Sequence, residues 1–312
     1  MIKKYTQPLI HISLFLATFF TTTLAGVMWL NKDPFDLQNF YLGLHYSISL
    51  LAILTAHEFG HYFAARYHRV NSTLPYYIPM PPFLFNPFGT MGAIIKIKSP
   101  IPTRRALFDI GASGPVAGFV VTLIIFMYGV FTLPTIDYLY AIHPEYKMTG
   151  TIPQTGLAFG NSLFTIGVRE LFSNQLFFPP MNEIYHYPFL CVGWFGLFIT
   201  ALNLIPIGQL DGGHILYALI GRKQGIFARI FFGSLIVIGL SSFIPLPYFS
   251  IHAGTVGWLV FALILYFLIK LDHPPIYDDA ELDPTRKLIG WITIVIFIFT
   301  FLPVPFYELI PT

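Results

Sequence analysis

Long apolar stretches, separated by short polar or proline-containing breaks, dominate the chain. A helix needs about 20 mainly apolar residues to cross the hydrocarbon core of a bilayer. Seven stretches approach or exceed that length, and a shorter apolar segment, 211–220, joins the fourth to the fifth. The pattern therefore predicts an all-α polytopic membrane protein with about seven transmembrane helices, at 9–30, 43–67, 106–133, 187–206, 225–247, 253–270 and 287–303.

Three connections between these stretches have patterns of their own. Residues 68–105 are rich in proline, turn at Gly89 and Gly92, and then partly alternate between apolar and polar positions, which predicts a short membrane-associated β-strand region near 89–98. The connection 134–186 predicts a small cap or an amphipathic helix near 162–172. The acidic, proline-containing loop 271–286 is interpreted as a solvated linker.

The composition agrees with a membrane protein. The 312 residues are 55% hydrophobic and only 10% charged, whereas soluble domains carry about 25% charged residues. A net charge of +2, spread along the chain, gives no basis for nucleic-acid binding. The single cysteine, Cys191, excludes an internal disulfide bond. The lipid bilayer is thus the first expected partner, and nucleic acid is not one.

The distribution of basic residues predicts an orientation. Cytoplasmic loops of membrane proteins accumulate Lys and Arg. If the N-terminus is cytoplasmic and 9–30 is a retained helix, 14 of the 17 Lys and Arg residues fall on the inner side, and only Lys32, Lys147 and Arg169 fall outside. We expect a multi-pass protein of the bacterial inner membrane, or secondly of an organelle membrane, with its N-terminus in the cytoplasm.

The second apolar stretch contains an HExxH sequence, from His57 through Glu58 to His61. Residues four apart face the same side of a helix, so the two imidazoles are placed to bind one metal ion. An ionisable residue within the membrane costs on the order of 3 kcal/mol unless something compensates it. A bound cation would compensate Glu58; the alternative is that the histidines only form hydrogen bonds between helices.

A catalytic zinc site needs a third protein ligand and one open position. Asp211 is a candidate because it follows an apolar stretch and a helix-breaking Pro206, where irregular backbone can reach the interior of a bundle. From the residues alone, an interfacial turn is the favoured interpretation of Asp211. Asp109 is a second candidate, although its position next to Arg104 and Arg105 favours an interfacial charge.

The chain resembles the site-2 protease family of intramembrane zinc metalloproteases. The family's two signatures, HExxH and NxxPxxxLDG, are both complete here, the second beginning at Asn203. The resemblance implies that His57, His61 and Asp211 bind one catalytic Zn²⁺, that Glu58 is the general base, and that Asn203 helps to orient the substrate.

The resemblance covers roughly residues 43–220, which implies a catalytic core there and additional C-terminal transmembrane helices in 221–312 of a single polytopic domain, 1–312. The connection 134–186 is too short for an inserted PDZ domain, so we expect the form without a PDZ domain and without a C-terminal regulatory domain. A glycine-rich segment, 111–118, is also similar to one in the family, although close helix packing is the favoured interpretation. His186 and His214 are interpreted as structural polar contacts.

The predicted function is an intramembrane zinc metalloendopeptidase that cuts within or near the transmembrane segment of a substrate, which the resemblance suggests is a single-pass protein. A helical substrate must unwind locally, and we expect Gly92, Ala93, Ile94 and Ile95 to pair with the unwound segment.

Two other functions are compatible with parts of the sequence. One is a serine protease that uses the GxSG sequence at 111–114 with His214. The other is a non-enzymatic transporter or channel that uses the His57, Glu58 and Asp211 cluster as an ion site.

Overall fold

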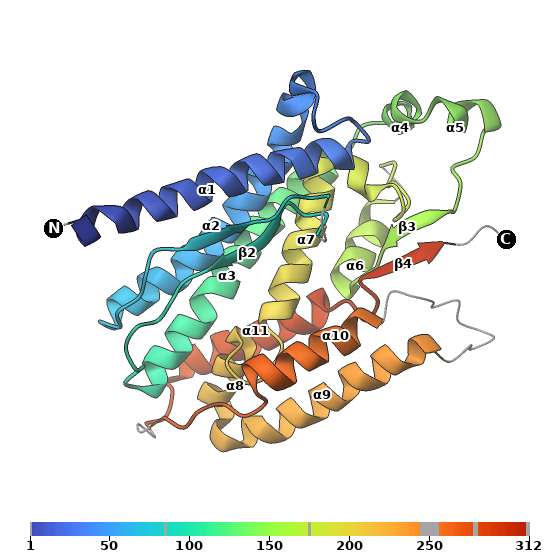
Figure 1. Cartoon of the computed structure of the whole chain (residues 1–312). Helices are drawn as coiled ribbons and strands as arrows, with labels where there is room; N and C mark the ends of the chain where they lie inside the picture. The colour runs from blue at the N-terminus through green and yellow to red at the C-terminus, as the bar shows by residue number, and fades with distance from the viewer. Residues whose placement is uncertain (1, 84–85, 174–175, 244–255, 277–279, 310–312) are drawn as a thin grey trace. The chain divides into compact units, whose positions relative to one another are not determined.

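The computed structural model describes residues 2–83, 86–173, 176–243, 256–276 and 280–309 (Figure 1). The protein is mainly helical, as the apolar pattern predicts, with two small antiparallel sheets. The chain forms two compact units that exchange segments. The first comprises Met1–Pro100, Val116–Pro144 and Tyr185–Gly196, and the second comprises Ile101–Pro115, Glu145–Ile184 and Leu197–Thr312.

In the first unit, helices α1 (Ile2–Trp29) and α2 (Leu44–Tyr67) pack together and are joined by a 3₁₀ helix, η1 (Leu37–Gly43). Small residues allow this close packing: a Cβ atom at Gly26 would lie 2.7 Å from both the Gly43 carbonyl oxygen and the Tyr46 Cβ. Between the buried faces, the Thr22 and Ser47 hydroxyls form a 2.6 Å hydrogen bond. Small residues and interhelical hydrogen bonds of this kind are typical of helix packing in membranes.

A β-hairpin lies against α1 and consists of β1 (Tyr76–Pro79) and β2 (Thr90–Ile94). Tyr77 pairs with Ala93, and Gly89 adopts a left-handed φ of +79° where its carbonyl oxygen accepts a 2.7 Å hydrogen bond from the Thr21 hydroxyl. The strand predicted near 89–98 is therefore present but ends at Ile94, and only an isolated bridge at Ile97 continues the pairing.

The first unit also contains two later segments of the chain, 116–144 and 185–196, which hold four helices or parts of helices. Three are the part of α3 (Arg104–Phe131) from Val116 onward, α4 (Ile136–Ile142) and the start of α7 (Pro188–Asn203). The fourth is the end of a short 3₁₀ helix, η2 (Ile184–His186). Within the unit, a Cβ atom at Gly193 of α7 would lie 2.6 Å from the Phe126 ring of α3, so these two helices also depend on glycine for their close approach.

The second unit contains the first part of α3, the end of α7 and most of the C-terminal half of the chain. Its remaining elements are α5 (Pro144–Thr149) from Glu145 onward, β3 (Gly156–Phe159), α6 (Leu163–Phe172), α8 (Asp211–Ile220), η3 (Gly221–Lys223), α9 (Gln224–Leu240), η4 (Ser241–Phe243), α10 (Val256–Ile264), the π-helical turn η5 (Leu265–Ile269), α11 (Pro284–Thr300) and β4 (Phe306–Leu309).

Helix α6 confirms the prediction of a helix near 162–172. Ser162 caps its N-terminus: its side chain accepts a hydrogen bond from the Thr165 backbone, and the Thr165 hydroxyl accepts one from the Ser162 backbone N–H. This capping box satisfies backbone groups that the first turn of a helix leaves without partners. The strand β3 that precedes α6 pairs with β4, and the sequence pattern does not predict this sheet.

Two apolar clusters hold the second unit together. One joins Phe108 of α3 to Ile215 of α8 and Leu282. The other surrounds Trp258 of α10, whose indole N–H donates a 2.8 Å hydrogen bond to the Pro303 carbonyl oxygen. Burial of such side chains stabilises a fold by about 1.5–3 kcal/mol each in water, although packing replaces part of this driving force in a membrane.

In the described part of the chain, four helical segments are long and apolar enough to cross a membrane: Gln7–Trp29, Leu37–Tyr67, Arg104–Phe131 and Asp211–Phe243. Helices overlap all seven predicted stretches, but α7, Val256–Ile269 and the 17-residue α11 are shorter, so the prediction of seven transmembrane helices is not confirmed. The segment 211–220 forms helix α8, which joins α7 to α9 as predicted and has Gly221 as its C-cap. The predicted ends 244–247 and 253–255 lie outside the described residues.

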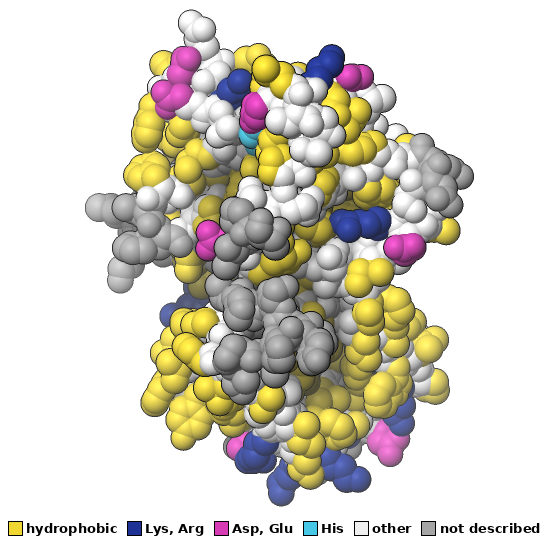
Figure 2. Space-filling model, turned by 90° about the vertical axis from the view of Figure 1, so that its right-hand side faces the viewer, with side chains coloured by type: hydrophobic (Ala, Val, Ile, Leu, Met, Phe, Trp, Pro, Cys, Tyr) yellow, Lys and Arg dark blue, Asp and Glu magenta, His cyan; other side chains and the backbone are white. Residues whose placement is uncertain are grey.

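Large apolar side chains remain on the surface of the spanning segments. On α9, Ile230 and Val237 are about two-thirds exposed, and hydrophobic side chains cover much of the described surface in Figure 2. Soluble monomers rarely expose extended apolar areas, whereas contact with lipid requires them. The exposed surface thus agrees with the sequence in making this a membrane protein.

Candidate metal centre

The two histidines of the HExxH sequence face each other on α2. Their Nε2 atoms lie 3.1 Å apart, and both side chains are buried, as is Glu58 between them. Helix α2 continues without a break from Leu44 to Tyr67, so the spacing of four residues places both rings on the same side of the helix.

The separation of the two nitrogens suits a shared metal ion. Zinc binds imidazole nitrogens at about 2.0–2.1 Å in tetrahedral geometry, which places two such nitrogens about 3.3 Å apart. The 3.1 Å between the Nε2 atoms of His57 and His61 is close to this value. The two buried imidazoles therefore have the chemistry and the spacing to share one divalent cation.

A glycine on α3 gives His57 the space it occupies. A Cβ atom at Gly118 would lie 3.1 Å from the His57 Cβ and 3.3 Å from its Nδ1. In the second unit, a Cβ atom at Gly111 would lie 2.8 Å from the His214 Cβ and 3.5 Å from the Asp211 carbonyl oxygen. The packing interpretation of the segment 111–118 is confirmed at these two positions.

A tyrosine that the sequence analysis did not single out lies near Glu58. The Tyr77 hydroxyl in β1 and the Thr55 hydroxyl in α2 form a 2.7 Å hydrogen bond. Burial raises the pKa of Tyr77, and the negative charge of Glu58 raises this pKa further while the bond to Thr55 lowers it. Nothing in the sequence signals this proximity, because it depends on how the hairpin docks.

The second signature places Asp211 at the start of α8 in the second unit. The preceding loop turns at Gly208, which has a φ of +53°. A side chain at Gly212 would collide with the Leu204 carbonyl oxygen, and one at Gly213 with the Gly208 carbonyl oxygen. The glycines after Asp211 thus let the loop fold back against the helix it leads into.

The other predicted residues of this unit occupy distinct places. Asn203 is the last residue of α7. The His214 Nδ1 lies 2.8 Å from the His273 Nε2, which is the polar contact predicted for His214. The two carboxylate oxygens of Asp109 accept hydrogen bonds of 2.8 and 2.6 Å from the Arg286 guanidinium, so this ion pair accounts for Asp109 without a metal.

The serine considered for a GxSG site lies inside α3. The Ser113 hydroxyl donates a 3.1 Å hydrogen bond to the Ile110 carbonyl oxygen in the preceding turn. This back-bonding is common for serine within helices, and it gives no support to a nucleophilic role.

The residues predicted to bind substrate follow β2. Gly92 has a φ of +96° and open space around it, Ala93 is buried, and Ile94 is 55% exposed. Ile95 follows the end of the strand. Among the described residues β2 pairs with β1 alone, so its other edge is available in the described part of the chain.

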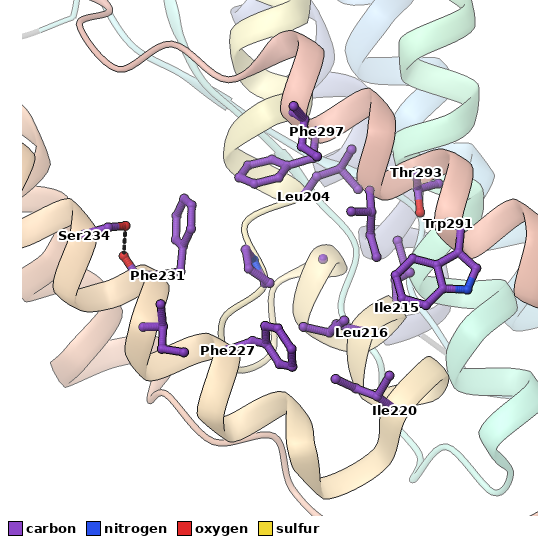
Figure 3. Close-up of a pocket in the computed structure, with 15 residues that line it drawn as sticks. Leu204, Ile215, Leu216, Ile220, Phe227, Phe231, Ser234, Trp291, Thr293 and Phe297 are labelled. Carbon is purple, nitrogen blue, oxygen red and sulfur yellow. Dashed lines mark hydrogen bonds between the residues drawn. The ribbon is translucent and has the colours of Figure 1, made fainter.

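An apolar pocket of about 350 Å³ lies in the second unit, and most of its lining comes from α8, α9 and α11 (Figure 3). Leu216 comes from α8, Phe227 and Phe231 come from α9, and Trp291 comes from α11. None of its fifteen lining residues is ionisable, so the pocket suits an apolar chain and offers no ligand to a metal.

A second pair of histidines lies in the first unit, outside the HExxH helix. The His143 and His186 Nε2 atoms are 3.0 Å apart, and the His186 Nδ1 lies 3.0 Å from the Trp29 carbonyl oxygen. The pKa of His186 is lowered to about 4, mainly by burial and also by the neighbouring His143, while the bond to Trp29 partly offsets these effects. His186 is therefore neutral at physiological pH.

Apolar helices that could span a membrane, one of which buries an HExxH histidine pair with the spacing for a shared metal ion, are typical of membrane metalloproteases. The model of peptidase family M50 matches residues 45–240, more than half of the chain. The chain belongs to this family, and the resemblance to the site-2 proteases is confirmed.

Several curated relatives are named as probable zinc metalloproteases. The chain is 29% identical over 279 residues to the protein named probable zinc metalloprotease EGY1, chloroplastic, of Arabidopsis thaliana, covering 87% of this chain and 46% of that protein. It is 27% identical to EGY2 of the same plant, covering 93% and 48%, and 28% identical to EGY2 of Oryza sativa subsp. indica, covering 93% and 49%. The chain thus spans about half the length of these relatives. Their names and the histidine pair both support zinc as the metal.

Proposed function

We propose that this protein is an intramembrane zinc metalloendopeptidase that hydrolyses a peptide bond within or near the transmembrane segment of a membrane protein. The observation that carries the proposal is the buried His57 and His61 pair with Glu58 beside it on one apolar helix. Bound zinc acts as a Lewis acid that polarises a carbonyl group and lowers the pKa of water.

In this proposal His57, His61 and Asp211 bind one zinc ion. Two imidazoles and one carboxylate form a donor set that catalytic zinc sites use, with one coordination position left open. Glu58 is the general base, because it is a buried carboxylate on the turn between the two histidines. Asn203, eight residues before Asp211 in the second signature, helps to orient the substrate.

The substrate is proposed to be a single-pass membrane protein. Its helix must unwind before a peptide carbonyl is open to attack, and the freed backbone groups then need partners. The open edge of β2, together with the next residue, Ile95, supplies such partners by strand addition, since β2 pairs only with β1 in the described part of the chain.

We also propose the extent of the catalytic core, the orientation of the chain and the membrane in which it lies. The catalytic core is residues 43–220 of one polytopic domain, and the helices in 221–312 are additional. The excess of Lys and Arg on one side supports a cytoplasmic N-terminus. The proposed location is the bacterial inner membrane, with an organelle membrane as the alternative that the chloroplast relatives favour.

Metal analysis tests the proposal. Purified wild-type protein should contain bound zinc and should cleave a reporter with a single transmembrane helix, and a zinc chelator should abolish cleavage. Asp211→Ala should contain one zinc ion per chain fewer than wild type and should lose cleavage. Asp137→Asn, which changes an exposed carboxylate of α4, is the matched control and should retain both. Full zinc content and cleavage in Asp211→Ala would overturn the ligand assignment.

A further inference from the structure

The His143 and His186 pair repeats the geometry of the HExxH pair at a separate place in the chain. The two Nε2 atoms are 3.0 Å apart, compared with 3.1 Å for His57 and His61. The ring centroids are 5.0 Å apart in the first case and 4.7 Å in the second. Both separations are close to the distance of about 3.3 Å between two nitrogens that share a tetrahedral zinc ion.

The surroundings orient the pair toward a shared ion. The His186 Nδ1–H donates to the Trp29 carbonyl oxygen at 3.0 Å, which leaves the Nε2 lone pair directed at His143. Metal-binding histidines commonly donate their other ring N–H to a backbone carbonyl in this way. The Tyr138 hydroxyl also donates a 2.8 Å hydrogen bond to the His186 carbonyl oxygen, which fixes the backbone.

The two histidines come from different segments, each held in place. His143 is the C-cap of α4, and its backbone N–H donates to the Leu139 carbonyl oxygen at 2.8 Å. His186 ends η2, is fully buried, and lies two residues before the start of α7. A metal bridge between them would tie the end of α4 to the segment that leads into α7.

We propose that His143 and His186 are ligands of a second, structural zinc site, separate from the HExxH centre. Structural zinc sites have four ligands, and the chain offers a carboxylate close in sequence: Glu183 lies three residues before His186 and is buried. The Tyr146 hydroxyl and the Asn182 amide donate hydrogen bonds of 3.0 and 3.2 Å to the Glu183 Oε1, as the outer contacts of a metal-binding carboxylate do.

The zinc content of the purified protein in detergent tests this site, because each variant is compared with wild type in the number of zinc ions bound per chain. Wild type should contain two zinc ions per chain, and His143→Ala should contain one. His57→Ala should also contain one, and the double variant none. His45→Ala, at an exposed histidine of α2, is the matched control and should retain two. Equal zinc content in wild type and His143→Ala would overturn the proposal in favour of a hydrogen bond between the two histidines.

A second measurement separates loss of metal from loss of fold. In the His57→Ala background only the second site remains, so added zinc should raise the unfolding temperature and a chelator should lower it. Adding His143→Ala should abolish this response while leaving a cooperative unfolding transition. If the zinc response persists in the double variant, the ion does not bind at His143. Glu183→Gln should weaken the response if Glu183 is a third ligand, whereas an unchanged response would exclude it.

Discussion

Gly118 on α3 is in direct contact with His57 on α2. A Cβ atom at Gly118 would lie 3.1 Å from the His57 Cβ and 3.3 Å from its Nδ1, tighter than ordinary van der Waals contact. The absence of a side chain on one helix therefore sets the position of a proposed metal ligand on another.

We predict that Gly118→Ala will lower proteolytic activity about tenfold without lowering the unfolding temperature. The new methyl group must displace the His57 ring by a few tenths of an ångström, and a displacement of about 1 Å at a catalytic site costs about 100-fold. Alanine meanwhile favours the helix by up to about 1 kcal/mol over glycine. Cleavage rate, zinc content and thermal unfolding should be measured together.

Gly167→Ala on α6 is the matched control, because nothing lies within 4 Å of a Cβ atom at that position. It should leave both activity and zinc content unchanged. Unaltered activity in Gly118→Ala would show that His57 does not depend on this contact. A lower unfolding temperature in the same variant would point to general packing instead.

Glu58→Gln separates an enzyme from an ion carrier. The amide is nearly the same size as the carboxylate but accepts no proton, so a general base at this position predicts a loss of about 10²–10⁴-fold in cleavage with zinc retained. Metal content and reporter cleavage are the two measurements. A transporter or channel predicts altered ion flux in this variant and no cleavage product from wild type, and that result would contradict the enzyme assignment.

The parts of the fold that local sequence determines were predictable. The apolar stretches predict the helices, and Ser162 with Thr165 encodes the start of α6. The β3 and β4 strands were not predictable, because Phe159 and Phe306 pair across almost half of the chain and each strand has only four residues. Short strands carry little pattern of their own, so their pairing depends on the tertiary fold.

The same distinction applies to the site. His57 and His61 are four residues apart on one helix, so spacing alone predicts their geometry. The contact between Tyr77 and Thr55 joins a strand to a helix, and the contact between His143 and His186 joins positions 43 residues apart. No periodicity links such positions, and only the folded structure brings them together.

The ion pair between Asp109 and Arg286 should contribute measurably to stability. Both side chains are more than two-thirds buried and share two hydrogen bonds. Arg286→Gln removes the charge partner of Asp109, and breaking a partly buried charged hydrogen bond costs about 1.5–3 kcal/mol. We therefore expect a lower unfolding temperature in detergent.

A double-mutant cycle isolates this pair. Asp109→Asn combined with Arg286→Gln should be less destabilised than the sum of the two single variants, because neither charge is then left alone. Additive effects would show that the two side chains do not interact in solution. Zinc content should not change in any of the three variants, since neither residue is a proposed ligand.

Asp283 gives a prediction for pH. Its side chain accepts hydrogen bonds from the Arg286 side chain and backbone, which lower the pKa of Asp283 in the folded state. In the unfolded chain the pKa of an aspartate is about 3.9, so above pH 3.9 the lower pKa of Asp283 in the folded state stabilises the fold. This stabilisation is lost as the pH falls through the folded-state pKa of Asp283. The difference in unfolding temperature between wild type and Asp283→Ala should be constant near pH 7 and shrink below about pH 4. A difference that stays constant to pH 2 would contradict this linkage.

Proline substitution along β2 tests whether its open edge binds the substrate backbone. Alternate residues of a strand direct their N–H groups to opposite edges, and proline removes the N–H group. Across 93–97, one set of alternate positions should lose cleavage by tenfold or more with an unchanged unfolding temperature, because those N–H groups face the substrate. The other set includes Lys96, whose N–H donates a 2.9 Å hydrogen bond to the Thr73 hydroxyl, and should lower the unfolding temperature. Zinc content should be retained throughout, and Ile94→Ala and Ile95→Ala, which keep the N–H group, should cleave nearly normally. Normal cleavage by all the proline variants would exclude strand addition as the binding mode.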